Sequence, residues 1–130
     1  MEYAMKLAEI QTLSENFIRR IAKSQTSIQF KVLLFLKIYG VCTPKILIKK
    51  IGIIKTNLAA TLKQLMEQGF VVSSASPIDG RGKEFCLTQE GEKEVEKVLL
   101  QIESEMDISD NLRELDKALS VVIAVLNRKL

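Results

Sequence analysis

Hydroxyl and amide side chains recur between residues 55 and 68 at spacings that suit hydrogen bonding from one side of a helix: Thr56, Asn57, Thr61 and Gln64. Leu58, Leu62 and Leu65 recur at helical steps in the same segment, so we expect them to face a core while the polar groups and Ala60 face outward. Such a face suits the floor of a DNA major groove, where hydroxyls and amides hydrogen-bond base edges. Ordinary surface helices have a similar composition, so this segment alone leaves both interpretations open.

Basic residues are concentrated around this segment. Between Asn16 and Met66 the sequence has ten lysines and arginines and no acidic residue, whereas residues 67–130 hold eight basic and thirteen acidic residues. Alternating signs would keep a surface solvated equally well, so charge of a single sign over this length favours a polyanion partner such as nucleic acid. The candidate phosphate contacts are Thr43, Lys45, Lys49, Lys50, Lys55, Lys63 and Lys83.

The residue types needed for metal or acid–base chemistry are scarce. There is no histidine, and with Cys42 and Cys86 as the only cysteines one chain cannot complete a mononuclear structural zinc site. Both cysteines have apolar neighbours, which favours buried small hydrophobic residues over redox-sensing thiols. No pair of carboxylates stands out from solvated helix faces. We therefore expect neither an enzyme nor a bound cofactor.

Length and composition indicate a single folded domain. The chain has 130 residues, of which 47% are hydrophobic, and this is enough for a real core. Its apolar runs are far too short to span a bilayer, and the N-terminal segment carries acidic residues where a signal peptide would be apolar. These features predict a cytoplasmic protein with no membrane partner.

A short, lysine-rich helix is expected before residues 55–68. Thr43 would cap it, and Pro44 would occupy its first position, where the missing N–H of proline costs nothing. Gly52 would end it. Its expected inner face consists of Ile46, Leu47 and Ile51. Because only two residues separate this helix from the next, the pair predicts a helix-turn-helix.

The pattern changes after Gly69. Residues 70–72 and 83–88 favour strands, and the segment between them is rich in turn-forming residues. This predicts a β-hairpin with a long loop, whose tip holds Arg81 between two glycines. A flexible arginine at such a tip can enter a narrow minor groove, where the potential is most negative.

The order of these elements resembles the winged-helix domain of the MarR-type transcriptional regulators. That family has a threonine-proline helix, a recognition helix ending in a glycine-hydrophobic pair, an Asp-x-Arg wing and a Leu-Thr-x-x-Gly sequence, which stand here as Thr43-Pro44, residues 55–70, Asp79-Gly80-Arg81 and residues 87–91. The resemblance implies a mainly α fold: a winged helix-turn-helix domain with a small β-hairpin wing, flanked by N- and C-terminal dimerisation helices. Residues 27–91 would form the DNA-binding core of one domain that spans residues 1–130.

The segments outside this core have long apolar stripes. Residues 4–23 predict one helix, and two more are expected from Gln89, capped by Thr88, and from about Ser109 or Asp110. Three long helices exceed what a compact winged helix needs, so we expect residues 1–23 and 89–130 to form an intersubunit bundle, as the resemblance also implies. The candidate interface residues are Leu7, Ile10, Phe17, Leu112, Leu115, Leu119, Val122 and Leu126.

These features predict a homodimeric transcriptional regulator that binds specific sequences in duplex DNA, with base or groove contacts from Thr56, Asn57, Thr61, Gln64 and Arg81. Two alternatives stay open. Ile54 stands where the family often has a serine-like cap, and Ala60 where it often has an arginine, which is compatible with an architectural or protein-interaction module. The chain could also be a sensor that releases DNA on binding a small-molecule effector, since family members often bind ligands between the dimer arms.

Overall fold

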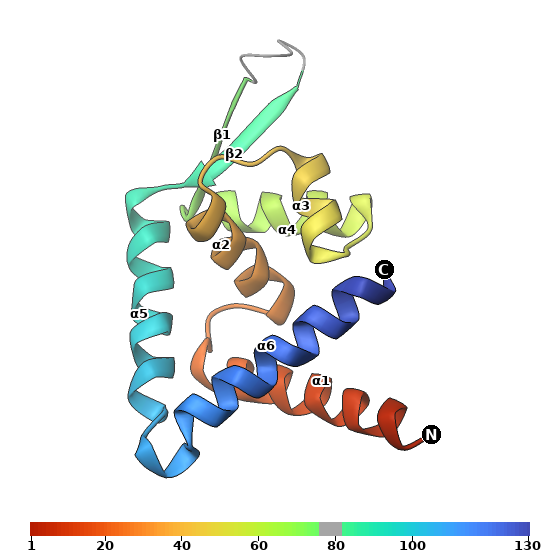
Figure 1. Ribbon diagram of the computed structural model, residues 1–130. Coiled ribbons are helices and arrows are strands. Elements are labelled where there is room, and N and C mark those ends of the chain that lie inside the picture. Colours follow the sequence, from red (N-terminus) through yellow and green to blue (C-terminus); the bar gives the residue numbers. More distant parts are fainter. Residues whose placement is uncertain (76–81) are drawn as a thin grey trace. The chain divides into compact units, whose positions relative to one another are not determined.

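The chain is mainly helical, with one small sheet (Figure 1). The computed structural model describes residues 1–75 and 82–130, apart from the side chain of Ile108. Its elements are α1 (Glu2–Ile21), α2 (Ser27–Tyr39), α3 (Pro44–Ile51), α4 (Lys55–Glu67), β1 (Val71–Ala75), β2 (Lys83–Leu87), α5 (Gln89–Glu105), the 3₁₀-helix η1 (Ile108–Asp110) and α6 (Leu112–Lys129). The predicted fold class is confirmed. The elements divide into two compact units, residues 1–98 and 99–130.

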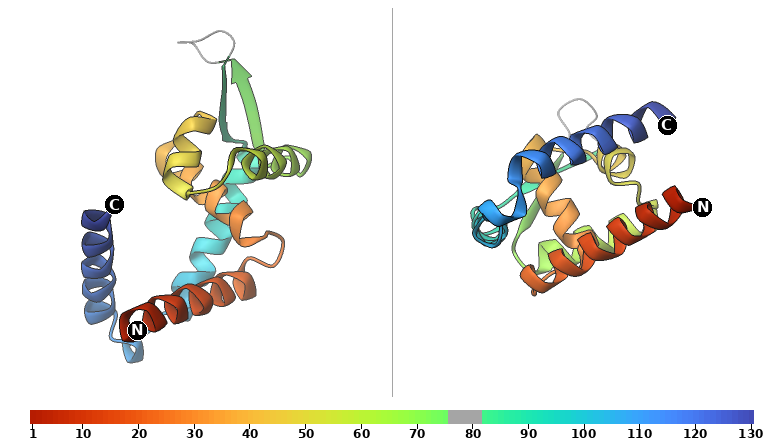
Figure 2. Two further views of the ribbon diagram at one scale, coloured as in Figure 1. Left: turned by 90° about the vertical axis from the view of Figure 1, so that its right-hand side faces the viewer. Right: turned by 60° about the horizontal axis from the view of Figure 1, so that its bottom comes forward.

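The core of the first unit lies where α2, α3 and α4 meet the hairpin (Figures 1 and 2). Five leucines are at most 2% exposed there: Leu33, Leu36, Leu47, Leu58 and Leu65. Burying a leucine side chain contributes about 1.5–3 kcal/mol relative to leaving it in water. Leu58, Leu62 and Leu65 are all buried as the sequence predicts. Their burial fixes which face of α4 remains outside.

The short helix α3 begins and ends at the predicted residues. The Thr43 hydroxyl accepts a hydrogen bond from the Ile46 amide at 3.3 Å, and Gly52 ends the helix with φ at 75°. The prediction that Ile46 lies on the inner face is wrong, because its side chain is 43% exposed. A helix of eight residues buries only a narrow stripe, and Ile46 lies about 100° around the axis from the fully buried Leu47.

The hairpin consists of β1 and β2 paired antiparallel, with Val71 opposite Leu87 and Ser73 opposite Phe85. Cys42 joins its edge, exchanging two backbone hydrogen bonds of 2.9 and 2.8 Å with Phe85. This pairing ties the segment before α3 to the hairpin. The predicted wing tip, including Arg81, lies outside the described residues.

A tight junction connects the end of α4 to the start of α5. The Thr88 amide donates to the Phe70 carbonyl at 3.0 Å, and the Thr88 hydroxyl donates to the Gly69 carbonyl at 2.6 Å while accepting from the Gly91 amide at 3.0 Å. Thr88 therefore caps α5, as predicted, and also holds the segment that follows α4. A Cβ atom on Gly91 would lie 2.1 Å from the Phe70 carbonyl oxygen, so the close packing requires glycine.

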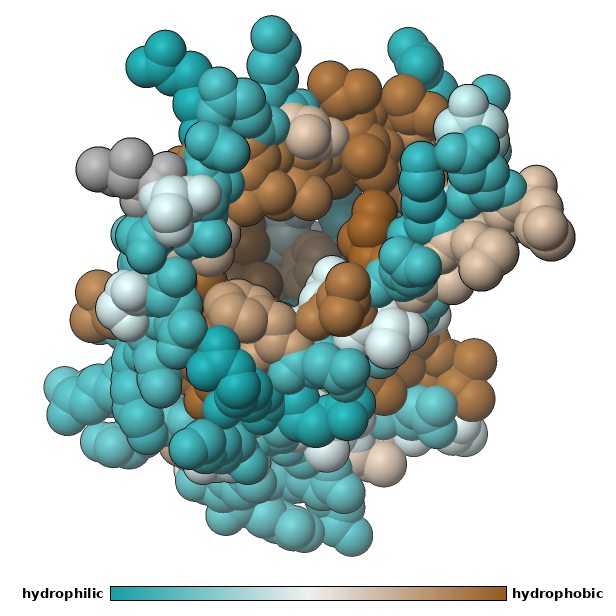
Figure 3. Space-filling model, turned by 90° about the horizontal axis from the view of Figure 1, so that it is seen from below, coloured by the Kyte–Doolittle hydropathy of each residue, from teal (hydrophilic) through white to brown (hydrophobic). Residues whose placement is uncertain are grey.

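The helix α1 exposes most of its apolar stripe. Leu7, Ile10 and Leu13 are 41%, 45% and 66% exposed, and Ile21 is the buried residue of this helix. Figure 3 shows apolar side chains at the surface among polar ones. In a chain considered alone, this stripe lies in contact with water. An exposed apolar stripe of this kind is typical of a surface that binds another protein.

The second unit contains the end of α5, η1 and α6. The predicted start of the last helix, Ser109 or Asp110, is three or two residues early, because residues 108–110 form η1 and Asn111 adopts a left-handed conformation with φ at 52°. Hydrogen bonds from the Ser109 side chain and backbone to Asp107 close this turn and lower the pKa of the Asp107 carboxyl group.

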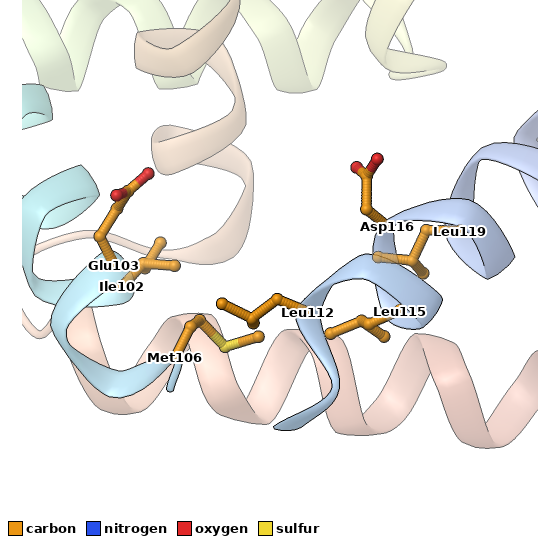
Figure 4. Close-up of a pocket in the computed structure, with 7 residues that line it drawn as sticks. All are labelled: Ile102, Glu103, Met106, Leu112, Leu115, Asp116 and Leu119. Carbon is orange, nitrogen blue, oxygen red and sulfur yellow. The ribbon is translucent and has the colours of Figure 1, made fainter. Parts of the chain in front are cut away.

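The apolar seam of α6 is only partly covered. Leu112, Leu119 and Leu126 are 42%, 47% and 41% exposed, and no described residue of α6 is fully buried. A groove of about 360 Å³ separates the end of α5 from the start of α6 (Figure 4). Its lining consists of Ile102, Glu103, Met106, Leu112, Leu115, Asp116 and Leu119. No described helix is both long enough and apolar enough to cross a bilayer.

Replacing Gly91 with alanine tests the junction. The new methyl group must displace the backbone at Phe70, so we expect Gly91→Ala to lower the free energy of unfolding by about 1–3 kcal/mol, measured by urea denaturation. Gln89→Ala, at an exposed position of the same helix, is the control and should change it by less than about 0.5 kcal/mol. Equal stability of the two variants would show that the junction is not tightly packed.

Candidate nucleic-acid interface

The structure confirms a helix-turn-helix formed by α3 and α4. The turn between them consists of Gly52, Ile53 and Ile54, and Ile53 is anchored in the core with 8% of its side chain exposed. Ile54 occupies the N-cap position of α4, is 64% exposed, and provides no side-chain hydrogen bond to the helix. The first turn of α4 therefore presents backbone N–H groups without a side-chain acceptor from its cap.

The prediction that Thr61 faces outward is wrong. Thr61 is only 7% exposed, and its hydroxyl donates to the Asn57 carbonyl of its own helix at 2.8 Å. The buried stripe of α4 includes position 61 as well as the three leucines, at the i, i+3, i+4 and i+7 positions that form a broad helical face. Because the hydroxyl is hydrogen-bonded within the helix, its burial costs little free energy.

Thr56, Asn57 and Gln64 are exposed on α4, as predicted. Opposite the buried stripe, Thr56, Ala60 and Lys63 follow one another at helical spacing, and Glu67 continues this line at the C-terminal end of the helix. The side chains of Thr56 and Ala60 are short, and Lys63 adds a positive charge. Gln64 lies at the flank of this face, where its amide oxygen accepts a hydrogen bond from Gln29 Nε2 of α2 at 2.9 Å. This face can approach a groove closely and present hydrogen-bonding groups to it.

Solvent-exposed lysines surround the helix-turn-helix. Within the part of the chain that the structure describes, none of the following forms an ion pair with a carboxylate: Lys45, Lys49, Lys50, Lys55, Lys63 and Lys83. The Lys50 ammonium lies 5.6 Å from the centre of the Tyr39 ring. Unpaired ammonium groups on exposed side chains are suited to neutralising phosphates. Thr43, the other candidate phosphate contact, uses its hydroxyl as the cap of α3.

Lys37 differs from these lysines. Its ammonium contacts Glu92 and Glu96 of α5, the latter at 3.1 Å. The hydrogen bonds that Lys37 donates to Glu92 first, and then to Glu96, raise the pKa of Lys37 above its ordinary value. The contacts stabilise the fold at pH below that ordinary value and are lost as pH rises through the raised pKa. This basic residue of the acid-free stretch therefore holds α2 against α5.

The hairpin projects beyond α3 and α4 (Figure 2). Lys83 is exposed at the start of β2. Arg81, the predicted minor-groove contact, lies outside the described residues.

The two cysteines differ in burial. Cys42 is 2% exposed, and burial raises the pKa of its thiol, which disfavours the reactive thiolate. Cys86 is half-buried on β2. The described residues contain no group of three or more histidine, cysteine, aspartate or glutamate side chains placed to hold a metal ion.

The sequence pattern did not single out Gln29. It is 7% exposed, forms a capping box with Thr26 at the start of α2, and reaches Gln64 on α4. The Thr-x-x-Gln spacing is the signal that could have identified the capping box. The contact between helices depends on how α2 crosses α4, which no local pattern specifies.

Comparison with known proteins gives one family and one fold. The model described as "MarR family" matches residues 26–83. A comparison with curated protein sequences gives no match.

Three solved structures illustrate the likeness. Apo MarR from E. coli is 21% identical, with a TM-score of 0.75, and the alignment covers 92% of this chain and 95% of that one. NadR in complex with 4-hydroxyphenylacetate is 24% identical, with a TM-score of 0.81 and coverage of 94% and 89%. The repressor CouR, bound to a 23-mer DNA duplex, is 24% identical, with a TM-score of 0.75 and coverage of 97% and 91%. At these identities the likeness shows a shared winged-helix fold.

Proposed function

We propose that this chain is a MarR-family transcriptional regulator that binds specific duplex DNA sequences as a homodimer, since the MarR family model matches its winged-helix segment, residues 26–83. The observation that carries the proposal is the exposed face of the helix-turn-helix, where α4 presents short polar side chains and the lysines around it have no acidic partners among the described residues. CouR, which shares the fold, is bound to duplex DNA in its structure. No chemistry on the DNA is involved, and the protein acts in the cytoplasm.

The proposed complex places α4 in the major groove. Thr56, Asn57 and Gln64 would face base edges, while the exposed lysines of α3 and α4 would contact phosphates. Arg81 would enter the adjacent minor groove. Thr61 is no longer among the proposed base contacts, because its hydroxyl is buried and bonded within α4.

The homodimer is proposed from the exposed apolar stripes. Leu7 and Ile10 on α1, and Leu119 and Leu126 on α6, are each between 41% and 47% exposed. A second copy of the chain would cover these stripes, and twofold symmetry would present two α4 helices to successive major grooves.

An effector is the second candidate role. A groove of about 280 Å³ lies between α1 and α2, and its mostly apolar lining includes Ile18, Phe30 and Leu34. NadR, which shares the fold, holds 4-hydroxyphenylacetate in its structure. We propose that a small molecule with an apolar body would bind this groove and alter DNA binding.

The salt dependence of binding tests the phosphate contacts. If the lysines neutralise phosphates, the logarithm of affinity should fall with the logarithm of salt concentration at a slope of about −0.9 per phosphate. Replacing Lys49 and Lys50 with alanine should flatten this slope for every DNA sequence, whereas Lys117→Ala in the acidic C-terminal part should leave it unchanged. No binding at low salt would favour the protein-interaction alternative.

Analytical ultracentrifugation tests the dimer. Wild-type protein should be dimeric at micromolar concentration. Leu119→Glu combined with Leu126→Glu should weaken dimerisation at least about thirtyfold, since it places uncompensated charges in the apolar interface. Ser120→Glu, on an exposed position of the same helix, is the control. A monomeric wild-type protein at high concentration would contradict the proposed homodimer.

Comparing specific with random DNA separates the regulator from an architectural protein. Asn57→Ala should cost about 1–3 kcal/mol on the preferred site and little on random DNA. Arg81→Ala should weaken both, because the minor-groove pattern is largely degenerate. Equal losses on both DNAs for both variants would show that α4 does not select sequence, and the architectural alternative would then be the better account.

A further inference from the structure

We propose that Gln29, a residue of α2 that does not itself face the groove, determines which base edges Gln64 can bind, by fixing the orientation of the Gln64 amide. Gln29 is therefore a positioning residue for sequence selection. The inference rests on the proposed DNA-binding function and adds a specific chemical preference to it.

The orientation follows from hydrogen-bonding groups that can act in only one way. The backbone N–H of Thr26 can only donate, and it donates to Gln29 Oε1 at 3.1 Å. The oxygen of the Gln29 amide is thereby assigned to Thr26, so its NH₂ group is the end that points toward α4. Gln29 Nε2 then donates to Gln64 at 2.9 Å, which requires the amide oxygen of Gln64 to face α2.

Burial makes this arrangement difficult to break. Gln29 is 7% exposed, and its own backbone N–H donates to the Thr26 hydroxyl at 3.1 Å, which closes the capping box. If Gln64 turned its oxygen away, the NH₂ of Gln29 would lose its partner in a buried position, and unsatisfied buried donors are costly. The Gln64 side chain is exposed, so its remaining groups face solvent.

The consequence for recognition is that Gln64 presents only a hydrogen-bond donor to the base edges. A free glutamine binds adenine by accepting from N6–H and donating to N7, which needs both ends of the amide. Here the bond from Gln29 turns the oxygen toward α2, so the NH₂ of Gln64 is the end of the amide that is turned toward the groove. An amide NH₂ pairs with acceptors, which are O6 and N7 of guanine, N7 of adenine and O4 of thymine. Cytosine, which presents the N4 donor at this edge, should be rejected.

The substitution Gln29→Glu reverses the amide while keeping the capping box. A carboxylate can still accept from the Thr26 N–H, because the capping box takes Glu or Gln at this position. It offers only acceptors to α4, so Gln64 must turn its NH₂ toward α2 and its oxygen toward the groove. Gln64 would then prefer base edges that donate, which are N4 of cytosine and N6 of adenine.

Binding-site selection from random duplexes, followed by competition among the four bases at the selected position, measures the preference. For wild-type protein we expect a base with an acceptor, which is guanine, thymine or adenine, at one base pair in each half-site, favoured about tenfold over cytosine. Gln29→Glu should invert that preference and leave the other positions unchanged. Because the added charge weakens binding to all DNA, the ratio between bases is the relevant quantity, not the affinity.

Two further variants keep the result interpretable. Gln64→Ala should abolish the preference at that base pair in both the wild-type and the Gln29→Glu background. Gln29→Met, which keeps a similar volume without an amide, frees Gln64 to rotate and should relax the preference so that cytosine is also accepted. Urea denaturation confirms that each variant is folded. An unchanged base order in Gln29→Glu, or an inversion that persists without Gln64, would overturn the inference.

The free protein separates this inference from the proposed function. One side-chain amide proton of Gln64 should shift downfield in the NMR spectrum of Gln29→Glu, because it then donates to a carboxylate. If this shift occurs but the wild-type protein selects no DNA sequence, Gln29 does orient the Gln64 amide and the proposed function is wrong. If the wild-type protein selects a DNA sequence and the shift is absent, the proposed function stands, and the inference that Gln29 orients the Gln64 amide is wrong.

Discussion

The burial of one leucine stripe on α4 is the constraint on which the rest of the interface depends. Leu58, Leu62 and Leu65 are at most 3% exposed, and together they contribute several times the free energy of a single hydrogen bond, at about 1.5–3 kcal/mol each. Once this stripe packs against the core, Thr56, Ala60 and Lys63 must face outward. Thr88 and Gly91 then hold the segment that follows α4 against α5. The recognition face is therefore held by apolar packing along one side and by a backbone junction at one end.

Charge placement complements this packing. Apart from Glu67, the last residue of α4, the helix-turn-helix lies in a stretch without acidic residues, whereas the carboxylates are concentrated in α5 and the segments after it. Lys37 shows how the two regions are used differently. It contacts Glu92 and Glu96 and so stabilises the fold, while the lysines of α3 and α4 keep their charge exposed. Exposed ion pairs contribute little to stability, so the greater effect of this distribution is on a polyanion approaching the helix-turn-helix.

Local patterns in the sequence predicted the elements well. The caps at Thr43 and Thr88, the end of α3 at Gly52 and the strand regions were found because turn and capping chemistry involves neighbouring residues. The predicted faces were less accurate. Thr61 is buried and Ile46 is exposed, because the width of a buried stripe depends on what packs against the helix rather than on its own residues.

The contacts between helices could not be predicted from the sequence. The hydrogen bond from Gln29 to Gln64 joins residues 35 positions apart and depends on how α2 crosses α4. The dimerisation helices are another case. Their apolar stripes are visible in the sequence, but identifying what covers them requires a partner, so the assignment of residues 1–23 and 89–130 to a dimer interface stays a prediction.

Hydroxyl-radical footprinting on a DNA site selected by the protein tests the central claim most directly. A homodimer that inserts two α4 helices should protect two symmetry-related patches, with centres about one helical turn, roughly 10 base pairs, apart on a palindromic sequence. Protection without symmetry, or protection that spreads evenly over unrelated sequences, would contradict the account.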